Sequence, residues 1–255
     1  MDIDLEQALA VARRAAEAAA TAALAHVGTG VPIEYKADES PVTAADREAE
    51  AAIVAILREA FPTHAITGEE SGELAGDRRS RWIVDPVDGT RGFTRGGMFW
   101  GPLIALEHDG AIVAGALGLP VLGEIYVAAR GLGCWRGSER ITVSTTARWA
   151  DATLSLGEQR RIIDQLGLEA YLRIVRGAQT VRSFGDVGAA AMLLAGRADA
   201  WIECGVSEWD VAPQRILVEE AGGRFLELPR TGGKYSVIAT NGHVHDELVA
   251  LLRPE

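Results

Sequence analysis

Cysteine is scarce in this chain. Among its 255 residues only Cys134 and Cys204 occur, far apart and without the spacing of a metal site. So few thiols exclude the disulfide framework that stabilises many small secreted proteins. We therefore expect two reduced cysteines and a cytoplasmic protein.

Basic residues are also few. The chain has 25 Lys and Arg against 36 Asp and Glu, a formal net charge of −11. Surfaces that bind nucleic acid need clustered Lys and Arg, so this balance argues against a nucleic-acid partner. If such an acidic protein acts on a phosphate, cations or backbone N–H groups must neutralise the repulsion locally.

Several sequence signals are missing. Residues 2–24 carry acids and the pair Arg13–Arg14 within an amphipathic pattern, so we expect neither a signal peptide nor a membrane span. No P-loop or dinucleotide fingerprint occurs. The stretch GEESG at 68–72 is not a serine nucleophile elbow, because its middle residue is Glu70.

What is present is a globular pattern. Apolar residues make up 48% of the chain, which is long enough for one large domain or two fused lobes. Helical patterns alternate with strands, and an Asp-Gly hairpin signal at 103–117 adds antiparallel pairing. This predicts a mixed α/β protein with lobes over 1–150 and 151–255. Helices are expected over 4–27, 43–60, 159–166, 187–196, 207–223 and 246–253. Strands are expected over 33–36, 81–85, 124–130, 154–156, 198–204, 223–228 and 235–242, and a further short strand is expected to end at GEES, 68–71.

The stretch IVDPVDGTRGF at 83–93 places Asp85 and Asp88 three positions apart after an apolar strand. Two carboxylates that close repel each other unless one is protonated or a cation lies between them. The pattern therefore indicates either a tight turn with solvated acids or a metal site.

Acidic residues also occur at two other element boundaries, in GEES at 68–71 and at Asp210. A ligand set of oxygen atoms without nearby His or Cys suits Mg²⁺, Mn²⁺ or Ca²⁺. Such a cluster can bridge two ions about 4 Å apart, as in enzymes that hydrolyse phosphate esters. Each acid taken singly has a structural explanation: Asp88 with Gly89 as a turn, and Asp210 as a first-turn acid of a helix.

Three segments together resemble the signatures of the inositol monophosphatase superfamily: GEES at 68–71, WIVDPVDGT at 82–90 and WDVAPQRILVEEAGG at 209–223. They occur in the family order, and the resemblance covers essentially the whole chain. It implies a layered α/β/α/β/α sandwich, Mg²⁺-dependent hydrolysis of a small phosphate ester, and a homodimer.

The resemblance also implies a role for each matching residue. Two Mg²⁺ ions bind tightly and a third more weakly, and Asp46, Glu69 and Thr90 act on the attacking water. Lys36 matches a lysine near that water, although it also fits a solvated lysine at a strand end. Asp46, three residues after Thr43, also fits a helix capping pattern. The implied metal ligands are Glu69, Asp85 and the Val87 carbonyl for the first ion, and Asp85, Asp88 and Asp210 for the second; Gly89 and Thr90 bind the phosphate at a helix start.

Within the family the chain looks most like the histidinol-phosphate phosphatases. The resemblance lies in GTRGFTRGGMFWGPLIAL at 89–106 and in SFGD, which ends at Asp186; Met98 stands where relatives often have Pro. Asp186 and Glu203 would then pair with the cationic substrate, although Asp186 also fits the N-cap of the helix at 187–196. An inositol monophosphatase or another sugar or nucleotide phosphatase is the alternative, and a non-catalytic binding homologue is a third.

Overall fold

The structure, a computed structural model, describes residues 3–30, 32–36 and 41–253. The α-helices in these ranges are α1 (Leu5–Leu24), α2 (Ala44–Ala60), α3 (Thr90–Phe93), α4 (Gln159–Leu166), α5 (Leu168–Gly177), α6 (Asp186–Leu194), α7 (Glu208–Glu220) and α8 (His245–Ala250). The strands are β1 (Glu34–Tyr35), β2 (Pro41–Val42), β3 (His64–Gly68), β4 (Gly72–Leu74), β5 (Asp77–Asp88), β6 (Gly101–His108), β7 (Ala111–Leu119), β8 (Glu124–Ala129), β9 (Gly133–Arg136), β10 (Glu139–Ile141), β11 (Thr153–Leu156), β12 (Thr180–Arg182), β13 (Ala200–Val206), β14 (Arg224–Glu227) and β15 (Tyr235–Thr240).

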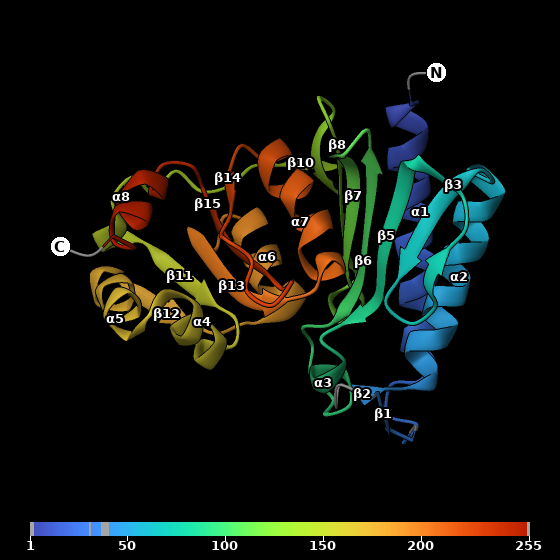
Figure 1. Cartoon of the computed structure of the whole chain (residues 1–255), viewed down its shortest axis with the longest axis horizontal. Helices are drawn as coiled ribbons and strands as arrows, with labels where there is room; N and C mark the ends of the chain where they lie inside the picture. The colour runs from blue at the N-terminus through green and yellow to red at the C-terminus, as the bar shows by residue number, and fades with distance from the viewer. Residues whose placement is uncertain (1–2, 31, 37–40, 254–255) are drawn as a thin grey trace.

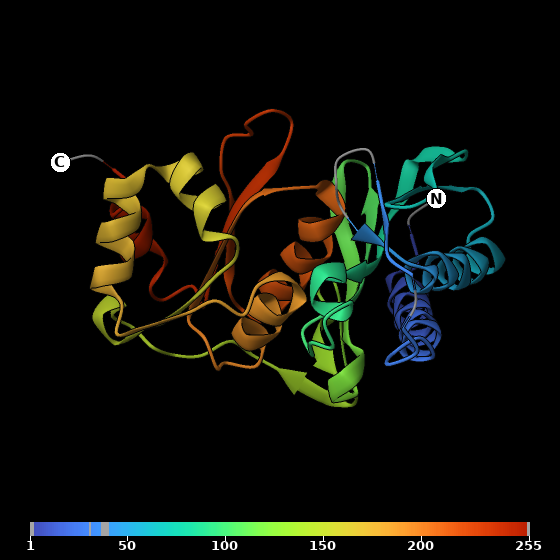
Figure 2. The same cartoon turned by 90° about the horizontal axis from the view of Figure 1, so that it is seen from below.

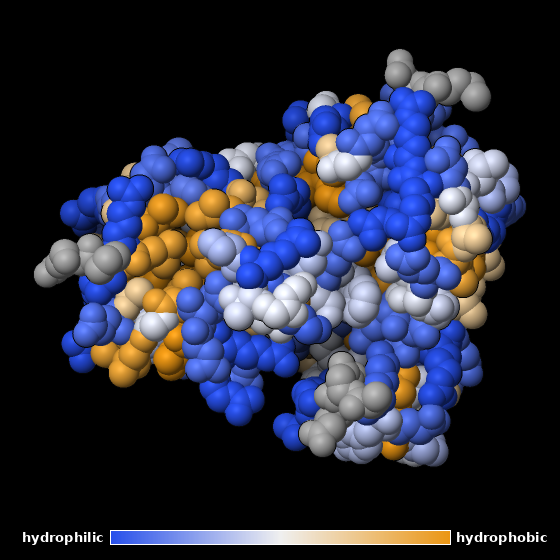
Figure 3. All heavy atoms as spheres, viewed as in Figure 1, coloured by the Kyte–Doolittle hydropathy of each residue, from blue (hydrophilic) through white to orange (hydrophobic). Residues whose placement is uncertain are grey.

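These elements form five layers, and Figures 1 and 2 show the same order from two directions. Helices α1 and α2 cover the outer face of a first sheet. Helices α6 and α7 lie between this sheet and a second one. Helices α4, α5 and α8 lie beyond the second sheet. The expected α/β/α/β/α sandwich is therefore confirmed. In Figure 3, hydrophobic side chains gather over α5, α8 and the neighbouring strand β11, while much of the remaining surface in that view is hydrophilic.

The two outer helices begin at side-chain caps. Asp4 accepts a hydrogen bond from the Gln7 backbone N–H at 2.9 Å, which starts α1. At the start of α2, Thr43 and Asp46 form the predicted capping box, in which each side chain accepts from the other residue's backbone N–H. Helix α1 turns a stripe of buried alanines toward the sheet, and these small side chains let helix and sheet approach closely; α2 buries Ala45 and Ala49 together with Ile53 and Leu57.

The first sheet contains eight strands among the described residues, in the order β10-β9-β8-β7-β6-β5-β3-β4. Its one parallel pair is β3 with β5; the other neighbours are antiparallel. The hairpin predicted from the Asp-Gly signal is confirmed: β6 and β7 join at Asp109 and Gly110, with φ of 50° and 76°. Two consecutive positive φ values are those of the turn that matches strand twist.

The second sheet has the order β12-β11-β13-β15-β14, with β11 parallel to both of its neighbours. The chain passes into it between Ile141 and Thr153. One hydrophobic core includes Leu117 of the first sheet, Leu193 of α6, Leu217 of α7 and Trp201 of the second sheet. Helices α6 and α7 share this core with both sheets, so packing against both sheets sets the position of α7. The division into lobes over 1–150 and 151–255 stays a prediction.

Several short elements escaped prediction: helix α5, which follows Gly167, and strands β2, β4, β9, β10 and β12. The unpredicted strands have two to four residues, too few to show a two-residue hydrophobic period. The expected helix over 4–27 ends earlier, at Leu24, and the turn expected after β1 falls largely outside the described residues. Among the described residues, no helix is both long and apolar enough to cross a membrane.

Candidate active site

The predicted aspartates lie where β5 ends. Asp85 is buried, and its Oδ1 accepts a hydrogen bond from the Val87 N–H at 2.9 Å. The pairing register with β6 shifts between Asp85 and Asp88. This irregularity turns the strand end so that the second carboxylate points into the same space as the first.

Asp210 reaches that space from α7. It is the third residue of the helix, and its Oδ2 accepts a hydrogen bond from the Ser207 N–H at 2.7 Å within a capping box. The structural explanation, an acid in the first turn, is therefore true of Asp210. This capping role does not prevent Asp210 from binding a metal ion, because the second carboxylate oxygen, Oδ1, does not take part in the cap.

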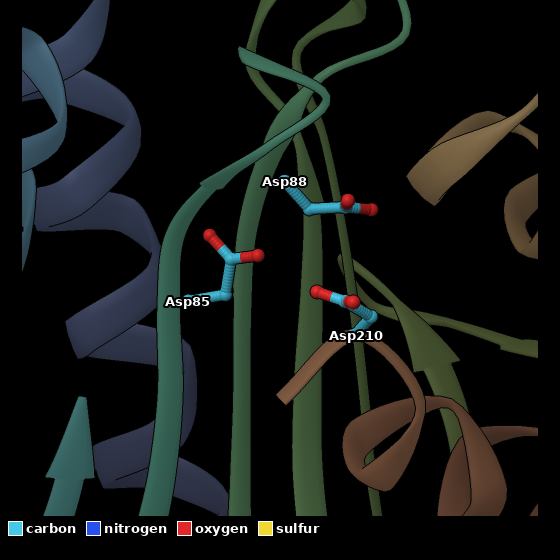
Figure 4. A group of neighbouring side chains, drawn as sticks. All are labelled: Asp85, Asp88 and Asp210. Atoms are coloured by element: carbon cyan, nitrogen blue, oxygen red, sulfur yellow. The ribbon is translucent and has the colours of Figure 1, made fainter. Parts of the chain in front are cut away.

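The three carboxylates of Asp85, Asp88 and Asp210 face one another in Figure 4, and one oxygen from each lies within 4.8 Å of the others. Burial and the neighbouring acids raise the pKa of Asp85 and of Asp88. Burial raises the pKa of Asp210 to about 7. Asp88 Oδ2 is buried and has no hydrogen-bond partner among the described residues. An unsatisfied buried oxygen within an all-oxygen donor set fits a hard divalent cation.

Glu69 follows β3 and lines the same pocket. Lys36 Nζ lies 2.8 Å from Glu69 Oε1 and 2.6 Å from Glu70 Oε1. The alternative of a solvated strand-end lysine is wrong, because Lys36 is partly buried and pairs with two glutamates, of which Glu69 lines the pocket. Glu50 of α2 orders this turn, since its carboxylate accepts from the backbone N–H groups of Glu70 and Ser71.

Thr90 and Asp46 meet, as the resemblance implied. Thr90 Oγ1 lies 3.1 Å from Asp46 Oδ1 and 2.9 Å from the Val87 carbonyl oxygen. The hydroxyl has one proton and donates it to one of these acceptors at a time. Asp46 Oδ2 meanwhile accepts from Thr43 at the start of α2. Asp46 therefore caps a helix with one oxygen and faces Thr90 with the other.

Gly89 is the N-cap of α3 and has φ of 84°. A Cβ at this position would lie 2.8 Å from the Phe99 carbonyl oxygen and 3.2 Å from Asp186 Oδ2. Both the conformation and the space therefore require glycine. The same contact places Asp186 beside the predicted phosphate-binding turn.

Asp186 and Glu203 lie near Asp88, whose pKa both raise by their charge, but neither of them lines the pocket around the carboxylates. Asp186 is exposed and has φ of 44°. The N-cap of α6 is Gly185, so the N-cap explanation for Asp186 is wrong. Glu203 is buried; burial, reinforced by the charge of Asp186, raises its pKa to about 8.

The pocket has a volume of about 580 Å³. Glu69, Asp85, Val87, Asp88, Gly89, Thr90 and Asp210 all line it, as does Lys36. Two further cations on its wall were not predicted: Arg161 of α4 and Lys234, which precedes β15. No sequence signal marks them, because they come from segments far from the three signatures and become neighbours only through the second sheet.

Comparison with known proteins agrees with this arrangement. A family model described as the inositol monophosphatase family matches residues 4–255. A histidinol-phosphatase of Mycobacterium tuberculosis is 36% identical over 98% of this chain and 97% of its own. The crystal structure of the extragenic suppressor protein suhB from Bartonella henselae superposes with a TM-score of 0.88 at 31% identity, covering 96% of this chain and 98% of that one. An inositol monophosphatase from Anabaena gives a TM-score of 0.83 at 30% identity over 98% and 96% of the two chains.

The layered fold, the carboxylate cluster and these matches define a phosphoric monoester hydrolase. The chain belongs to the inositol monophosphatase family, whose members depend on metal ions.

Asp210→Asn tests the cluster. Asparagine keeps an oxygen that can accept from Ser207, so the α7 cap and the fold should persist. Loss of one of the three charges should weaken Mg²⁺ binding by about tenfold or more and abolish turnover. Calorimetric titration with Mg²⁺ measures the first effect and a phosphate-release assay the second. Glu219→Gln, at the exposed end of the same helix, is the matched control. Unchanged Mg²⁺ binding in Asp210→Asn would remove Asp210 from the ligand set.

Proposed function

We propose that this chain is a Mg²⁺-dependent phosphatase that hydrolyses histidinol phosphate. The observation that carries the metal-dependent part is the carboxylate cluster, together with the buried and unsatisfied Asp88 Oδ2. The name of the Mycobacterium tuberculosis relative supports the substrate. The acids Asp186 and Glu203, near the proposed phosphate-binding turn, support histidinol phosphate as the substrate independently of that name.

The proposed ligands divide into two sets that share Asp85. Glu69, Asp85 and the Val87 carbonyl would hold one Mg²⁺, and Asp85, Asp88 and Asp210 the other; a third, weaker ion would lie near Asp46. When bound, the ions would polarise the phosphate ester and lower the pKa of the attacking water. The Val87 carbonyl has two lone pairs, so it can accept from Thr90 and still act as a ligand.

Thr90 and Asp46 would prepare the attacking water. When Thr90 donates its proton to Asp46, its oxygen lone pairs are left facing the pocket. They can accept a hydrogen bond from water, which orients a water lone pair toward phosphorus. The buried Asp46 carboxylate is held by Thr43, so the pair keeps its geometry before substrate arrives.

The start of α3 would bind the phosphate. Gly89 and Thr90 lie at the mouth of the metal cluster, and the glycine conformation leaves no side chain over the turn. Backbone N–H groups at such a turn interact favourably with phosphate oxygens.

Thr90→Ala tests the proposed role of the hydroxyl. Because the hydroxyl is proposed to act on the water, its loss should lower kcat by about tenfold to a thousandfold while KM changes little. Steady-state kinetics at saturating Mg²⁺ separate the two parameters. Thr90→Ser, which keeps the hydroxyl, should recover most of the rate. A raised KM with unchanged kcat in Thr90→Ala would instead assign Thr90 to substrate binding.

Two acids near the carboxylate cluster support a cationic substrate. Histidinol phosphate carries an ammonium group; Asp186 lies beside Gly89, and the charges of Asp186 and Glu203 both act on Asp88. A cation bound between these acids would reduce their mutual repulsion, which an uncharged polyol cannot do.

One observation favours a second candidate, an inositol monophosphate. The pKa of Glu203 is raised to about 8. At neutral pH a protonated Glu203 can both donate and accept hydrogen bonds, which suits substrate hydroxyls. The Anabaena relative is named an inositol monophosphatase. The complete set of expected ligands around the pocket argues against a non-catalytic homologue.

Asp186→Asn discriminates between the substrates. Asparagine tolerates a positive φ as well as aspartate does, so the free energy of unfolding should barely change. If Asp186 pairs with the ammonium group, kcat/KM for histidinol phosphate should fall by about tenfold to a hundredfold, in line with 1–3 kcal/mol for a charged hydrogen bond. Hydrolysis of nitrophenyl phosphate, which has no cation, should stay nearly constant.

The ratio of kcat/KM for histidinol phosphate to kcat/KM for nitrophenyl phosphate, measured in wild type and in Asp186→Asn, shows whether Asp186 pairs with the ammonium group. Equal losses on both substrates would make Asp186 a structural or metal-site residue. A wild type that hydrolyses inositol phosphate as fast as histidinol phosphate would favour the second candidate.

Two further features belong to the proposal. Both cysteines are buried free thiols, which supports a reducing compartment such as the cytoplasm. A homodimer without nucleic-acid or membrane partners stays a prediction from the family resemblance and the acidic charge.

A further inference from the structure

Three residues along one face of β5 contact α7, each by a different kind of interaction. Side chains alternate along a strand, so Arg81, Ile83 and Asp85 point to the same side. Asp85 meets Asp210, and Ile83 packs with Ala212 in a small apolar cluster. The third contact, at Arg81, lies outside the pocket and outside the three family signatures.

Arg81 joins the first sheet to the start of α7. Its Nη1 lies 2.9 Å from Glu208 Oε2 and its Nη2 2.8 Å from Glu208 Oε1, a bidentate pair. Nη2 also lies 3.0 Å from Glu107 Oε2. Glu107 is the residue directly opposite Arg81 on β6, so the sheet itself anchors the guanidinium. The three side chains are only 20%, 23% and 26% exposed, so water screens these ion pairs less than it screens pairs at the surface.

The ion pair of Arg81 with Glu208 opposes the carboxylate repulsion that would separate β5 from the start of α7. Glu208 and Asp210 both lie in the first turn of α7. When the three carboxylates are ionised and no cation is bound, Asp85 and Asp88 repel Asp210, which pushes the helix start away from β5. The attraction between Arg81 and Glu208 acts two residues earlier on the same turn and pulls it back. The apolar contact at Ile83 lies between the two.

We propose that Arg81 is a positioning residue for the metal centre: through Glu208 it holds the first turn of α7, and hence Asp210, in place before the cations bind. The inference rests on the proposed metal site. Arg81 itself touches neither substrate nor metal ligand, so its effect should appear in the cost of ordering the site and not in the chemical step.

The choice of arginine supports this role. A bidentate pair fixes orientation as well as distance, whereas lysine offers a single point charge on a flexible stem. Arg81→Lys therefore keeps the charge and removes the orientation, and Arg81→Gln removes both. Arg215→Lys is the matched control, because Arg215 lies on the same helix and pairs with Glu227 at 3.0 Å.

The first measurement is Mg²⁺ affinity by calorimetry on the full chain without substrate. The dissociation constant should rise by about threefold in Arg81→Lys and by about tenfold in Arg81→Gln, and stay within about twofold of wild type in Arg215→Lys. At saturating Mg²⁺, kcat should return to within about twofold of wild type in all three.

The second measurement is hydrogen exchange of residues 205–212 in the metal-free and Mg²⁺-bound protein. In Arg81→Gln these amides should exchange faster than in wild type without metal, and saturating Mg²⁺ should remove the difference. Residues 214–220, farther along the helix, should be unaffected. Glu208→Gln, which alters the partner instead, should reproduce both effects and serves if an Arg81 variant does not fold.

The outcomes distinguish a failure of the proposed Mg²⁺ site from a failure of the positioning role of Arg81. A wild type that binds no Mg²⁺ would overturn the proposed metal site. A wild type that binds Mg²⁺, with Arg81 and Glu208 variants of unchanged affinity and unchanged exchange, would overturn the positioning role alone. Lower global stability with unchanged affinity would likewise make Arg81 a structural residue only.

Discussion

Mutual repulsion among one buried carboxylate, Asp85, and two half-buried ones, Asp88 and Asp210, is the constraint around which this molecule is arranged. Asp85, Asp88 and Asp210 bring oxygens within 4.8 Å of one another, and burial raises the pKa of all three. Neighbouring carboxylates that are shielded from water are not stable together unless other interactions offset their repulsion and the cost of their desolvation. The contacts around the cluster keep the carboxylates together, and a divalent cation would supply the missing charge.

The compensation comes from both sheets. Asp85 and Asp88 belong to β5, and Asp210 belongs to a helix whose far side packs against the second sheet. Capping boxes contribute at two places, because Asp46 and Asp210 are both the third residue of a helix and both accept from its N-cap backbone. In each case one oxygen serves the fold and the other is left for the site. A structural explanation for an acid at a helix start is therefore no argument against a functional one.

The sequence was informative where chemistry and local structure coincide. The signatures around Glu69, Asp85 and Asp210 predicted the layered fold and every acid of the cluster through the family resemblance that they carry. The acids could be located because metal ligands at strand ends and helix starts leave a compact pattern. The β6–β7 hairpin followed from Asp109–Gly110 for a similar reason: its turn requires positive φ. What could not be predicted depends on distant pairs. Arg161, Lys234 and the pair of Arg81 with Glu208 reach their places only through sheet packing, and nothing in their local sequence marks them. Asp186 was ambiguous for the opposite reason, since its place before a helix suggested a cap, but Gly185 occupies the cap position.

The central claim, that cations relieve the repulsion in the carboxylate cluster, is tested most directly by the free energy that Mg²⁺ adds to unfolding at two pH values. Asp210 has a folded-state pKa of about 7, above its ordinary value of 3.8, so the metal-free fold should lose stability as pH rises between these values. Mg²⁺ competes with protons for these oxygens and should therefore stabilise more at pH 8 than at pH 5.5. With Mg²⁺ at a hundred times its dissociation constant, the gain at pH 8 should be about 3 kcal/mol per site. Denaturant unfolding of the wild type with and without Mg²⁺ gives both increments. A gain of zero at both pH values would contradict the account.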